Sequence, residues 1–294
     1  MFALAHLSDP HLAPLPQPGW RELIGKRITG YINWRRRRCF IHSPEVLAAL
    51  VADLKTQTTD HIAVTGDIAN IAMADEFLRG RDWLDSLGPP HDVTFVPGNH
   101  DIYVKGAAEL AGRQWGAFMS GDDGSVRFPF VRRRENIALI GLSSGVPTAP
   151  LLATGWLGSK QLAELAGALD ALGHEKRFRV LLIHHPPVTS ARRHKRLLDA
   201  AILLRMIASH GVELLLHGHD HRHMVNWLDG PGGSRIPAVG VPSASNVPGQ
   251  AGDAAGYNIY RIEGECGAWQ CDVISRGLTA SGEMTQQRQF RLFG

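Results

Sequence analysis

Cysteine and long apolar runs are both scarce in this sequence. The three cysteines among the 294 residues, Cys39, Cys266 and Cys271, are an odd number and lack the paired spacing of a zinc site. We therefore expect reduced thiols and a cytoplasmic location. The first dozen residues show neither the basic segment nor the cleavage site of a signal peptide. No run approaches the ~20 apolar residues of a spanning helix, so we expect a soluble protein, at most peripheral to a membrane.

Charge imbalance is also small, whereas histidine is abundant. The formal net charge is +3, 44% of the residues are hydrophobic and 20% are charged, which is an ordinary globular composition. A chain of this length buries enough surface to fold without disulfides. The sequence contains 15 histidines, and several directly follow apolar runs. In α/β folds the chemistry gathers at such strand ends, so these histidines are candidate site residues.

Short apolar runs alternate with segments of helical periodicity along most of the chain. The runs are nearly continuous, which is typical of strands buried on both faces. They are Phe2–Leu7, His61–Thr65, Val93–Val96, Ile137–Leu142, Val180–Ile183 and Val212–Leu216. Helices are predicted at 43–54, with Ser43 as the N-cap, and at 77–87, 160–172 and 197–210. Shorter strands follow at 236–239, 257–262 and 269–273. This order predicts a single α/β domain over residues 1–294, built as a sandwich of two mixed sheets flanked by helices.

Five polar motifs stand where predicted strands give way to loops. They are Asp9-Pro10-His11, Gly66-Asp67 followed by Asn70, Gly98-Asn99-His100-Asp101, His184-His185-Pro186-Pro187 and Gly218-His219-Asp220-His221. The carboxyl ends of parallel strands form the ligand crevice of open α/β sheets. We therefore expect these separate pieces of sequence to converge on one site.

The residue types in the motifs suit a pair of metal ions. Carboxylate, imidazole and amide groups are ligands for Mn, Fe or Zn, and no thiolate is among them. Asp67 has two carboxylate oxygens and could bridge two ions. Two ions ~3.5–4 Å apart can clamp the attacking and leaving oxygens of a displacement at phosphorus. Of the two adjacent histidines, we prefer His184 to His185 because it follows the strand directly.

Taken in this order, the motifs resemble those of the calcineurin-like metallophosphoesterase superfamily, and of its cyclic-nucleotide phosphodiesterase-like branch in particular. The resemblance covers about Phe2–His223. It implies a four-layer α/β/β/α sandwich of two mixed sheets, with the metals at one edge and with the carboxyl-terminal tail completing the second sheet.

The resemblance also implies roles for individual residues. One metal would be held by Asp9, His11, Asp67 and His221, and the other by Asp67, Asn99, His184 and His219. His100 would be a non-ligand that contacts the phosphate or protonates the leaving group, and Asn99 would share in substrate binding. A hydroxide bridging the metals would be the nucleophile. Mn is the favoured metal, with Fe and Zn as alternatives.

One motif departs from the protein Ser/Thr phosphatase branch. Asn70 and Ile71 stand where that branch has a second acid and an arginine. The acid that would orient the catalytic histidine and the arginine that would bind a phosphomonoester dianion are therefore missing here. The departure favours a phosphodiester substrate, which carries less charge.

Other polar residues near the motifs receive lesser roles. Asp101 is expected to orient a neighbour by hydrogen bonding or to lie at a helix N-terminus. His217, Asp220 and His223 are interpreted as loop or orienting groups. The remaining candidates are interpreted as surface or core histidines: His6, His42, His61, His91, His174, His194 and His210.

A basic insertion at about residues 20–40 follows the first motif. It contains Arg21, Lys26, Arg27 and Arg35–Arg38 against a single acid, Glu22, with interleaved aromatic and aliphatic residues. Near-helical spacing relates Leu23, Ile24, Arg27, Ile28, Tyr31 and Ile32. We expect a basic amphipathic helix near the active site. It would serve as a lid, as an anionic-membrane contact through Arg35, Arg36, Arg37 and Arg38, or as a dimer contact, against the simpler interpretation of a packed helix with a solvated face.

These features predict a dinuclear metal-dependent phosphodiesterase. Candidate substrates are phospholipids, cyclic nucleotides and glycerophosphodiesters, and no specific nucleic acid is predicted. A phosphomonoesterase or a nucleotide-lipid pyrophosphohydrolase is the enzymatic alternative. A metal-stabilised module that binds membranes or nucleic acid without catalysis is the alternative of another class, and His100 argues against it because a scaffold needs no acid. The sequence does not indicate an oligomeric state.

Overall fold

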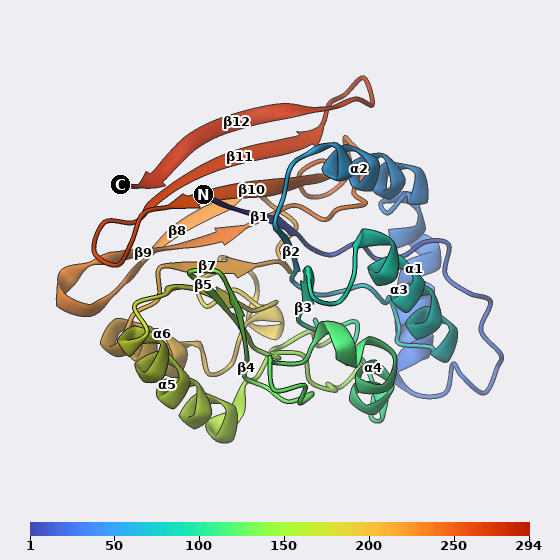
Figure 1. Ribbon diagram of the computed structural model, residues 1–294. Coiled ribbons are helices and arrows are strands. Elements are labelled where there is room, and N and C mark those ends of the chain that lie inside the picture. The colour runs from blue at the N-terminus through green and yellow to red at the C-terminus, as the bar shows by residue number, and fades with distance from the viewer.

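Two six-stranded mixed sheets form the centre of the protein in a computed structural model that describes residues 1–294 (Figure 1). The first sheet has the strand order β12-β11-β10-β1-β2-β3, and the second has the order β4-β5-β6-β7-β9-β8. The strands of the first sheet are β1 Phe2–Leu7, β2 His61–Val64, β3 Val93–Phe95, β10 Gly256–Glu263, β11 Gln270–Leu278 and β12 Met284–Phe293. Those of the second are β4 Phe130–Arg134, β5 Ile137–Gly141, β6 Phe178–Leu182, β7 Leu214–His217, β8 Met224–Asp229 and β9 Arg235–Gly240.

Helices cover the outer faces of both sheets. The helices of the protein are α1 Lys26–Arg36, α2 Pro44–Thr56, α3 Ala74–Leu87, α4 Ala107–Trp115, α5 Gly158–His174 and α6 Ala200–His210. Figure 1 shows α2, α3 and α4 beside β1–β3, whereas α5 and α6 lie against the second sheet. The predicted four-layer sandwich is confirmed.

The central strands β1, β2, β5 and β7 are buried along their whole length, and β6 along most of it, because layers cover both faces of each sheet. In β6, Val180 and Leu182 belong to the core between the sheets, which also includes β1 and α2. Leu181 belongs to the separate cluster under α5 and α6. The predicted N-cap of α2 is also present, since Ser43 Oγ accepts hydrogen bonds from the N–H groups of Glu45 (3.1 Å) and Val46 (3.2 Å).

The tail of the chain differs from the prediction. Strands β10, β11 and β12 pair antiparallel with one another, and β10 pairs with β1, so the end of the chain completes the first sheet and not the second. Strands β4, β8 and β12 and helix α4 were not predicted. Strand β12 lies at a sheet edge and has mostly exposed polar residues, and edge strands of this kind lack a continuous apolar signal. None of the helices is both long and apolar enough to cross a bilayer.

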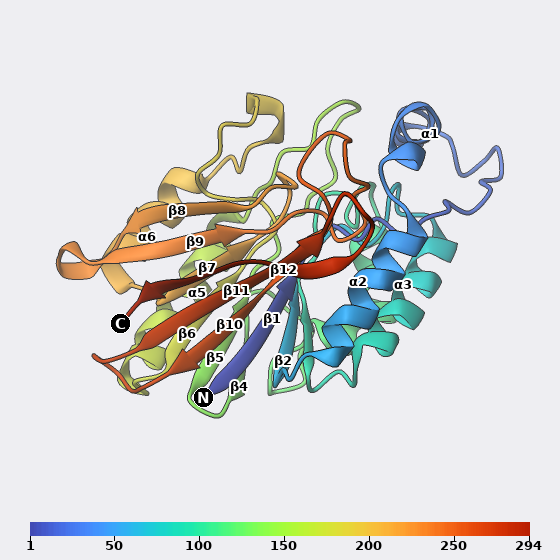
Figure 2. The ribbon, with the colours of Figure 1, turned by 90° about the horizontal axis from the view of Figure 1, so that it is seen from above.

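Parallel pairing places the motif-bearing loops at one edge. Strand β1 runs parallel to β2, and β2 to β3. Strands β5, β6 and β7 form a second parallel set. The loops that follow these strands therefore emerge together, and α1 stands beside them, apart from both sheets (Figure 2).

Candidate metal centre

The five motifs meet in loops whose backbone adopts an unusual conformation. Five residues of the motifs have positive φ angles although none is glycine: Asp9 (52°), His11 (39°), Asp67 (58°), His219 (70°) and His221 (52°). Such conformations cost of order 1–3 kcal/mol each and cluster at functional sites. The loops are therefore shaped to aim side chains at a common point, at a cost in folding stability.

Three side chains form the first donor group. The Oδ1 atom of Asp9 lies 3.0 Å from Nε2 of His221 and 3.8 Å from Nε2 of His11. The two histidine Nε2 atoms are 3.4 Å apart. Asp9 and His11 are buried, whereas His221 is half-buried. These atoms converge closely enough to share one cation.

A second donor group lies beside the first. His184 Nε2 is 3.3 Å from Oδ1 of Asn99 and 3.2 Å from Nδ1 of His219. Asn99 and His184 are buried, and His219 is half-buried. The group thus combines two imidazoles with an amide oxygen.

Asp67 lies between the two groups. Its Oδ2 atom is 3.9 Å from His11 Nε2 on one side and 3.4 Å from His184 Nε2 on the other. Its Oδ1 atom accepts a 2.8 Å hydrogen bond from the backbone N–H of His100. This single carboxylate therefore faces both donor groups, which is the position that a bridging ligand requires.

Backbone groups fix which atom each donor presents. The Nδ1 atoms of His11 and His184 donate to the carbonyl oxygens of Ala69 (3.3 Å) and Thr65 (2.7 Å), so their Nε2 lone pairs face inward. His219 instead bonds through Nε2 to the Lys195 carbonyl (2.9 Å) and presents Nδ1. Such outer hydrogen bonds set the tautomer and orientation of metal-binding histidines.

Asp9 and the loop around Asp67 are held in the same way. The outer Oδ2 atom of Asp9 accepts from Ser8 Oγ (2.7 Å) and from the N–H of His219 (3.0 Å), leaving Oδ1 inward. Asp101 accepts from the N–H groups of Asp67 (2.7 Å), Gly98 (2.8 Å) and Ala69 (2.9 Å). Asp101 therefore joins the loops after β2 and β3 and orients the residues beside it, which is one of the two roles expected for it.

The electrostatics of the site fit divalent cations. Burial lowers the pKa of His184, but the carboxylates of Asp67 and Asp9 outweigh this effect and raise the pKa to about 10. Burial raises the pKa of Asp67, but His184 and His100 hold it well below its usual range. The buried carboxylates of Asp9 and Asp67 thus favour positive charge at the point where the imidazole lone pairs converge. A donor set of oxygen and imidazole nitrogen without thiolate suits Mn, Fe or Zn.

His100 lies at the edge of both donor groups. Its Nδ1 is 2.5 Å from the carbonyl oxygen of Asn70, and its ring stacks on Tyr103 with ring centroids 5.6 Å apart. The backbone of Asn70 thus takes the orienting role for which the motif lacks an acid. Burial and the nearby Arg38 guanidinium lower the pKa of His100 to about 3.

The structure separates His184 from its neighbour. His185 Nδ1 is bonded to Ser144 Oγ (2.8 Å) and its Nε2 to the Ala153 carbonyl (3.2 Å), although one of its nitrogens lies near those of His184 and His219. His42, interpreted from the sequence as an ordinary histidine, is buried against the first donor group, with its ring centroid 4.5 Å from that of His11. No strand-end signal marks His42, because it follows the basic insertion.

Arg38 also differs from the prediction. Its Nη2 atom is 2.6 Å from His11 Nε2, and its Nη1 atom is 2.9 Å from His100 Nε2. The prediction that Arg35–Arg38 act as one membrane-facing group is therefore wrong for Arg38, because the chain leaves the helical conformation at Arg37 (φ −139°, ψ −57°) and turns the next side chain inward.

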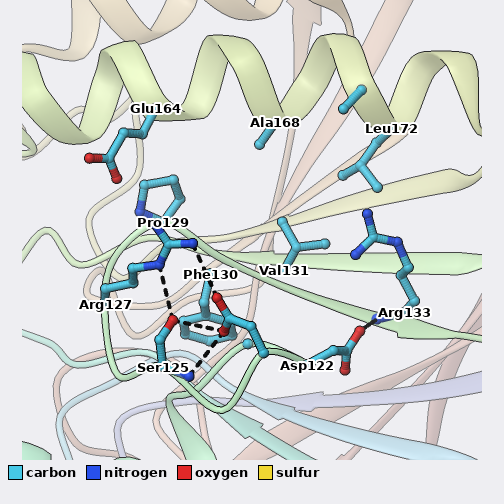
Figure 3. Close-up of a pocket in the computed structure, with 13 residues that line it drawn as sticks. Asp122, Ser125, Arg127, Pro129, Phe130, Val131, Arg133, Glu164, Ala168 and Leu172 are labelled. Carbon is cyan, nitrogen blue, oxygen red and sulfur yellow. Dashed lines mark hydrogen bonds and ion pairs between the residues drawn. The ribbon is translucent and has the colours of Figure 1, made fainter.

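The donor groups open into a cavity of about 700 Å³. Its wall includes the inner face of α1, through Lys26, Thr29, Gly30 and Asn33. A smaller hollow of about 400 Å³ lies between α5 and β4 (Figure 3). Its arginines are already paired, since Arg127 binds Asp123 within the hollow and Arg133 binds Glu175 outside its lining. The larger cavity is therefore the candidate active site.

Comparison with known proteins agrees with the fold and identifies the family. Residues 2–223 match the calcineurin-like phosphoesterase family, and the chain belongs to this family of metal-dependent hydrolases of phosphoesters. A relative from Synechococcus, described as a probable cyclic nucleotide phosphodiesterase, is 27% identical over 276 residues, which are 92% of this chain and 91% of the relative.

Solved structures show the same architecture. A dimetal phosphatase from Danio rerio superposes with a TM-score of 0.65 at 15% identity, over 97% of this chain and 98% of that one. A purple acid phosphatase from yellow lupin has a TM-score of 0.53 at 11% identity, over 99% of this chain and 53% of the lupin chain. At these identities the likeness concerns the fold.

Proposed function

We propose that this protein is a phosphodiesterase that holds two divalent metal ions. The observation that carries the proposal is the position of Asp67, one carboxylate oxygen of which faces His11 in the first donor group and His184 in the second. The first ion would be held by Asp9, His11, Asp67 and His221, and the second by Asp67, Asn99, His184 and His219. When bound, such a pair supplies a water-derived nucleophile of lowered pKa and neutralises charge on the phosphate.

The chain's own residues supply the remaining functions. His100 is held by Asn70 and Tyr103 at the edge of the donor groups, where it contacts the substrate phosphate or the leaving oxygen. Asn99, which precedes His100 in the chain, belongs to the second donor group and would share in substrate binding. Mn is the favoured metal, and Fe or Zn fit the same donors. The substrate is a phosphodiester of the phospholipid, cyclic nucleotide or glycerophosphodiester type.

Two soluble test substrates distinguish the proposal from its alternatives. After chelation and re-supply of Mn²⁺, we expect faster hydrolysis of bis(p-nitrophenyl) phosphate than of p-nitrophenyl phosphate, and no hydrolysis of either without metal. Activity confined to the monoester would replace the diesterase with a phosphomonoesterase. Two bound metals without hydrolysis of either compound would favour the non-catalytic binding module.

The orientation of α1 supports a membrane surface as the place where the substrate is met. The helix turns a polar face, including Lys26 and Asn33, toward the cavity. Two apolar residues of the helix, Ile28 (48% exposed) and Ile32 (44%), lie in solvent. Trp20 (73%) and Ile24 (70%) are also exposed, in the turn that precedes the helix. A helix with its apolar face in solvent marks an interaction surface.

The exposed arginines at the end of α1 indicate an anionic partner. Arg35, Arg36 and Arg37 are exposed and make no ion pair with any carboxylate. Basic residues beside exposed aromatic and aliphatic side chains suit the headgroup region of an anionic bilayer. We infer that this helix face lies on such a bilayer, peripherally and beside the cavity mouth.

Removing the three exposed arginines together, as R35S/R36S/R37S, is expected to weaken binding to phosphatidylserine-containing liposomes about 100-fold, from ~1 kcal/mol for each basic residue near the surface. The measurement is liposome co-sedimentation at fixed ionic strength. The matched control is K160S/K176S/R205S, which removes the same charge from exposed residues on or just after α5 and on α6, far from α1 (Figure 1). Equal weakening by both triple variants would show a general charge effect and would refute the assignment to α1.

A further inference from the structure

Arg38 is the one arginine of the basic insertion that reaches the donor groups. It begins the short 3-10 turn Arg38–Phe40, after α1 has ended at Arg36. Its guanidinium contacts His11 Nε2 (2.6 Å) and His100 Nε2 (2.9 Å). A metal on His11 would take the Nε2 lone pair that Arg38 contacts here, so the guanidinium of the metal-loaded protein would face the cavity beside His100, where a substrate phosphate would lie.

The guanidinium has no carboxylate partner. No Asp or Glu oxygen lies within 4.0 Å of it, whereas other partly buried arginines such as Arg179 and Arg276 are paired with Glu213 and Asp53. The Asp67 and Asp9 carboxylates of the donor groups stabilise this charge only from a greater distance, so the N–H groups of Arg38 have no anionic acceptor. The planar N–H fork of arginine matches two oxygens of a phosphate group.

The surrounding wall has the same sign of charge. Lys26 and Arg37 from the insertion line the cavity together with Lys195 and Arg222 from other loops, and none of these four makes an ion pair with a carboxylate. Apart from Asp67 of the donor groups, the one acid in the wall is Asp220, which accepts a 2.6 Å hydrogen bond from Thr189. The cavity therefore attracts anions before they reach the donor groups.

The insertion that carries Arg38 is fastened to the rest of the protein. Lys26 Nζ donates to Thr148 Oγ1 (2.6 Å) and to the Leu152 carbonyl (3.2 Å). Arg27 donates to the carbonyl oxygens of Ile71 (3.1 Å) and Ala72 (2.6 Å). Gly30 allows close packing, because a Cβ there would lie 2.6 Å from the hydroxyl of Tyr103. Groups fixed before the substrate arrives lose less entropy on binding it.

We propose that Arg38 binds two oxygens of the substrate phosphate. This inference rests on the proposed function, and it assigns to the insertion the arginine that the Gly66-Asp67 motif lacks. The guanidinium donates two parallel N–H groups to these oxygens, where it stabilises the negative charge that grows during displacement at phosphorus. The insertion is then part of the active site as well as a cover over it.

The test compares R38Q and R38K with wild type, using R113Q as the control because Arg113 is exposed on α4. Metal content is measured first, and the affinity for inorganic phosphate is then measured by calorimetry on Mn²⁺-loaded protein. We expect R38Q to retain both metals and to bind phosphate about 10- to 100-fold more weakly, as for a lost charge-assisted hydrogen bond. R38K should fall between R38Q and wild type, because an ammonium cannot form two parallel bonds.

Unchanged phosphate affinity in R38Q would overturn the inference, and loss of metal would show that Arg38 positions His11 instead. If R38Q does not fold, R38K decides, since wild-type phosphate affinity in that variant would exclude the two-pronged contact. Failure of the proposed function can be distinguished from failure of the inference about Arg38. A wild-type protein that hydrolyses neither test ester, yet loses phosphate affinity on R38Q, would retain the anion site without the diesterase.

Discussion

Asp67→Asn is expected to remove both metal ions and to lower diester hydrolysis by roughly 10³-fold, which corresponds to ~4 kcal/mol of lost transition-state stabilisation. The amide would keep an oxygen for the N–H of His100 but would lose the negative charge. Its NH₂ group would replace the Oδ2 atom that lies between His11 Nε2 and His184 Nε2. That group donates to both lone pairs instead of sharing a cation with them. Metal analysis after gel filtration, with bis(p-nitrophenyl) phosphate turnover, measures the effect.

The matched control is Asp220→Asn. Asp220 lines the same cavity and accepts from Thr189, but it belongs to neither donor group. The Asp220→Asn variant should retain two metals per chain. Circular dichroism of both variants checks that each is folded. Retention of two metals by Asp67→Asn would exclude a bridging role. Loss of only one would assign Asp67 to a single donor group.

The convergence of the donor groups could be predicted from the sequence because it follows from strand order. Continuous apolar runs identify strands buried on both faces, and the first predicted run coincides with β1. Once β1 and β2 are parallel neighbours, Asp9 and Asp67 must emerge at the same edge. Local sequence patterns were enough to predict this convergence, since each motif directly follows its strand.

The orientation of the insertion could not be predicted in this way. Helical spacing relates Ile28 to Tyr31, yet Tyr31 packs against the core while Ile28 faces solvent. Lys26 and Arg27 donate to backbone oxygens more than 40 residues away in the chain, those of Leu152 and Ile71, and these contacts decide which face turns inward. Such contacts exist only after the loops have folded.

Arg38 and His42 were missed for a related reason. A run of four arginines reads as one solvated face, and only the non-helical backbone at Arg37 separates Arg38 from Arg36. His42 lies between that turn and the N-cap of α2, where a histidine is ordinary. Its position beside His11 depends on Ser245, which accepts or donates at His42 Nδ1 (2.9 Å) from the far end of the chain.

His100→Asn is expected to lower turnover by roughly 10²- to 10⁴-fold, the usual contribution of a positioned acid or base, while both metals remain bound. Metals should remain because His100 belongs to neither donor group. Its Nδ1 is held by Asn70 and its Nε2 faces Arg38. Metal analysis tests the retention of metal, and steady-state kinetics test the loss of turnover. The control is His174→Asn, which changes an exposed histidine at the end of α5. Loss of metal would make His100 a ligand.

The leaving group then separates the two roles open to His100. Burial and Arg38 favour the neutral ring, but a bound phosphate anion raises the proton affinity of an adjacent imidazole. If His100 donates a proton, the defect of His100→Asn should be larger for a diester with a poor alkyl leaving group than for one that releases p-nitrophenolate, since the latter needs no acid. An equal defect for both diesters would mean that His100 acts by hydrogen bonding to the phosphate. In that case its task resembles that of Arg38, and the two side chains together form the non-metal half of the phosphate site.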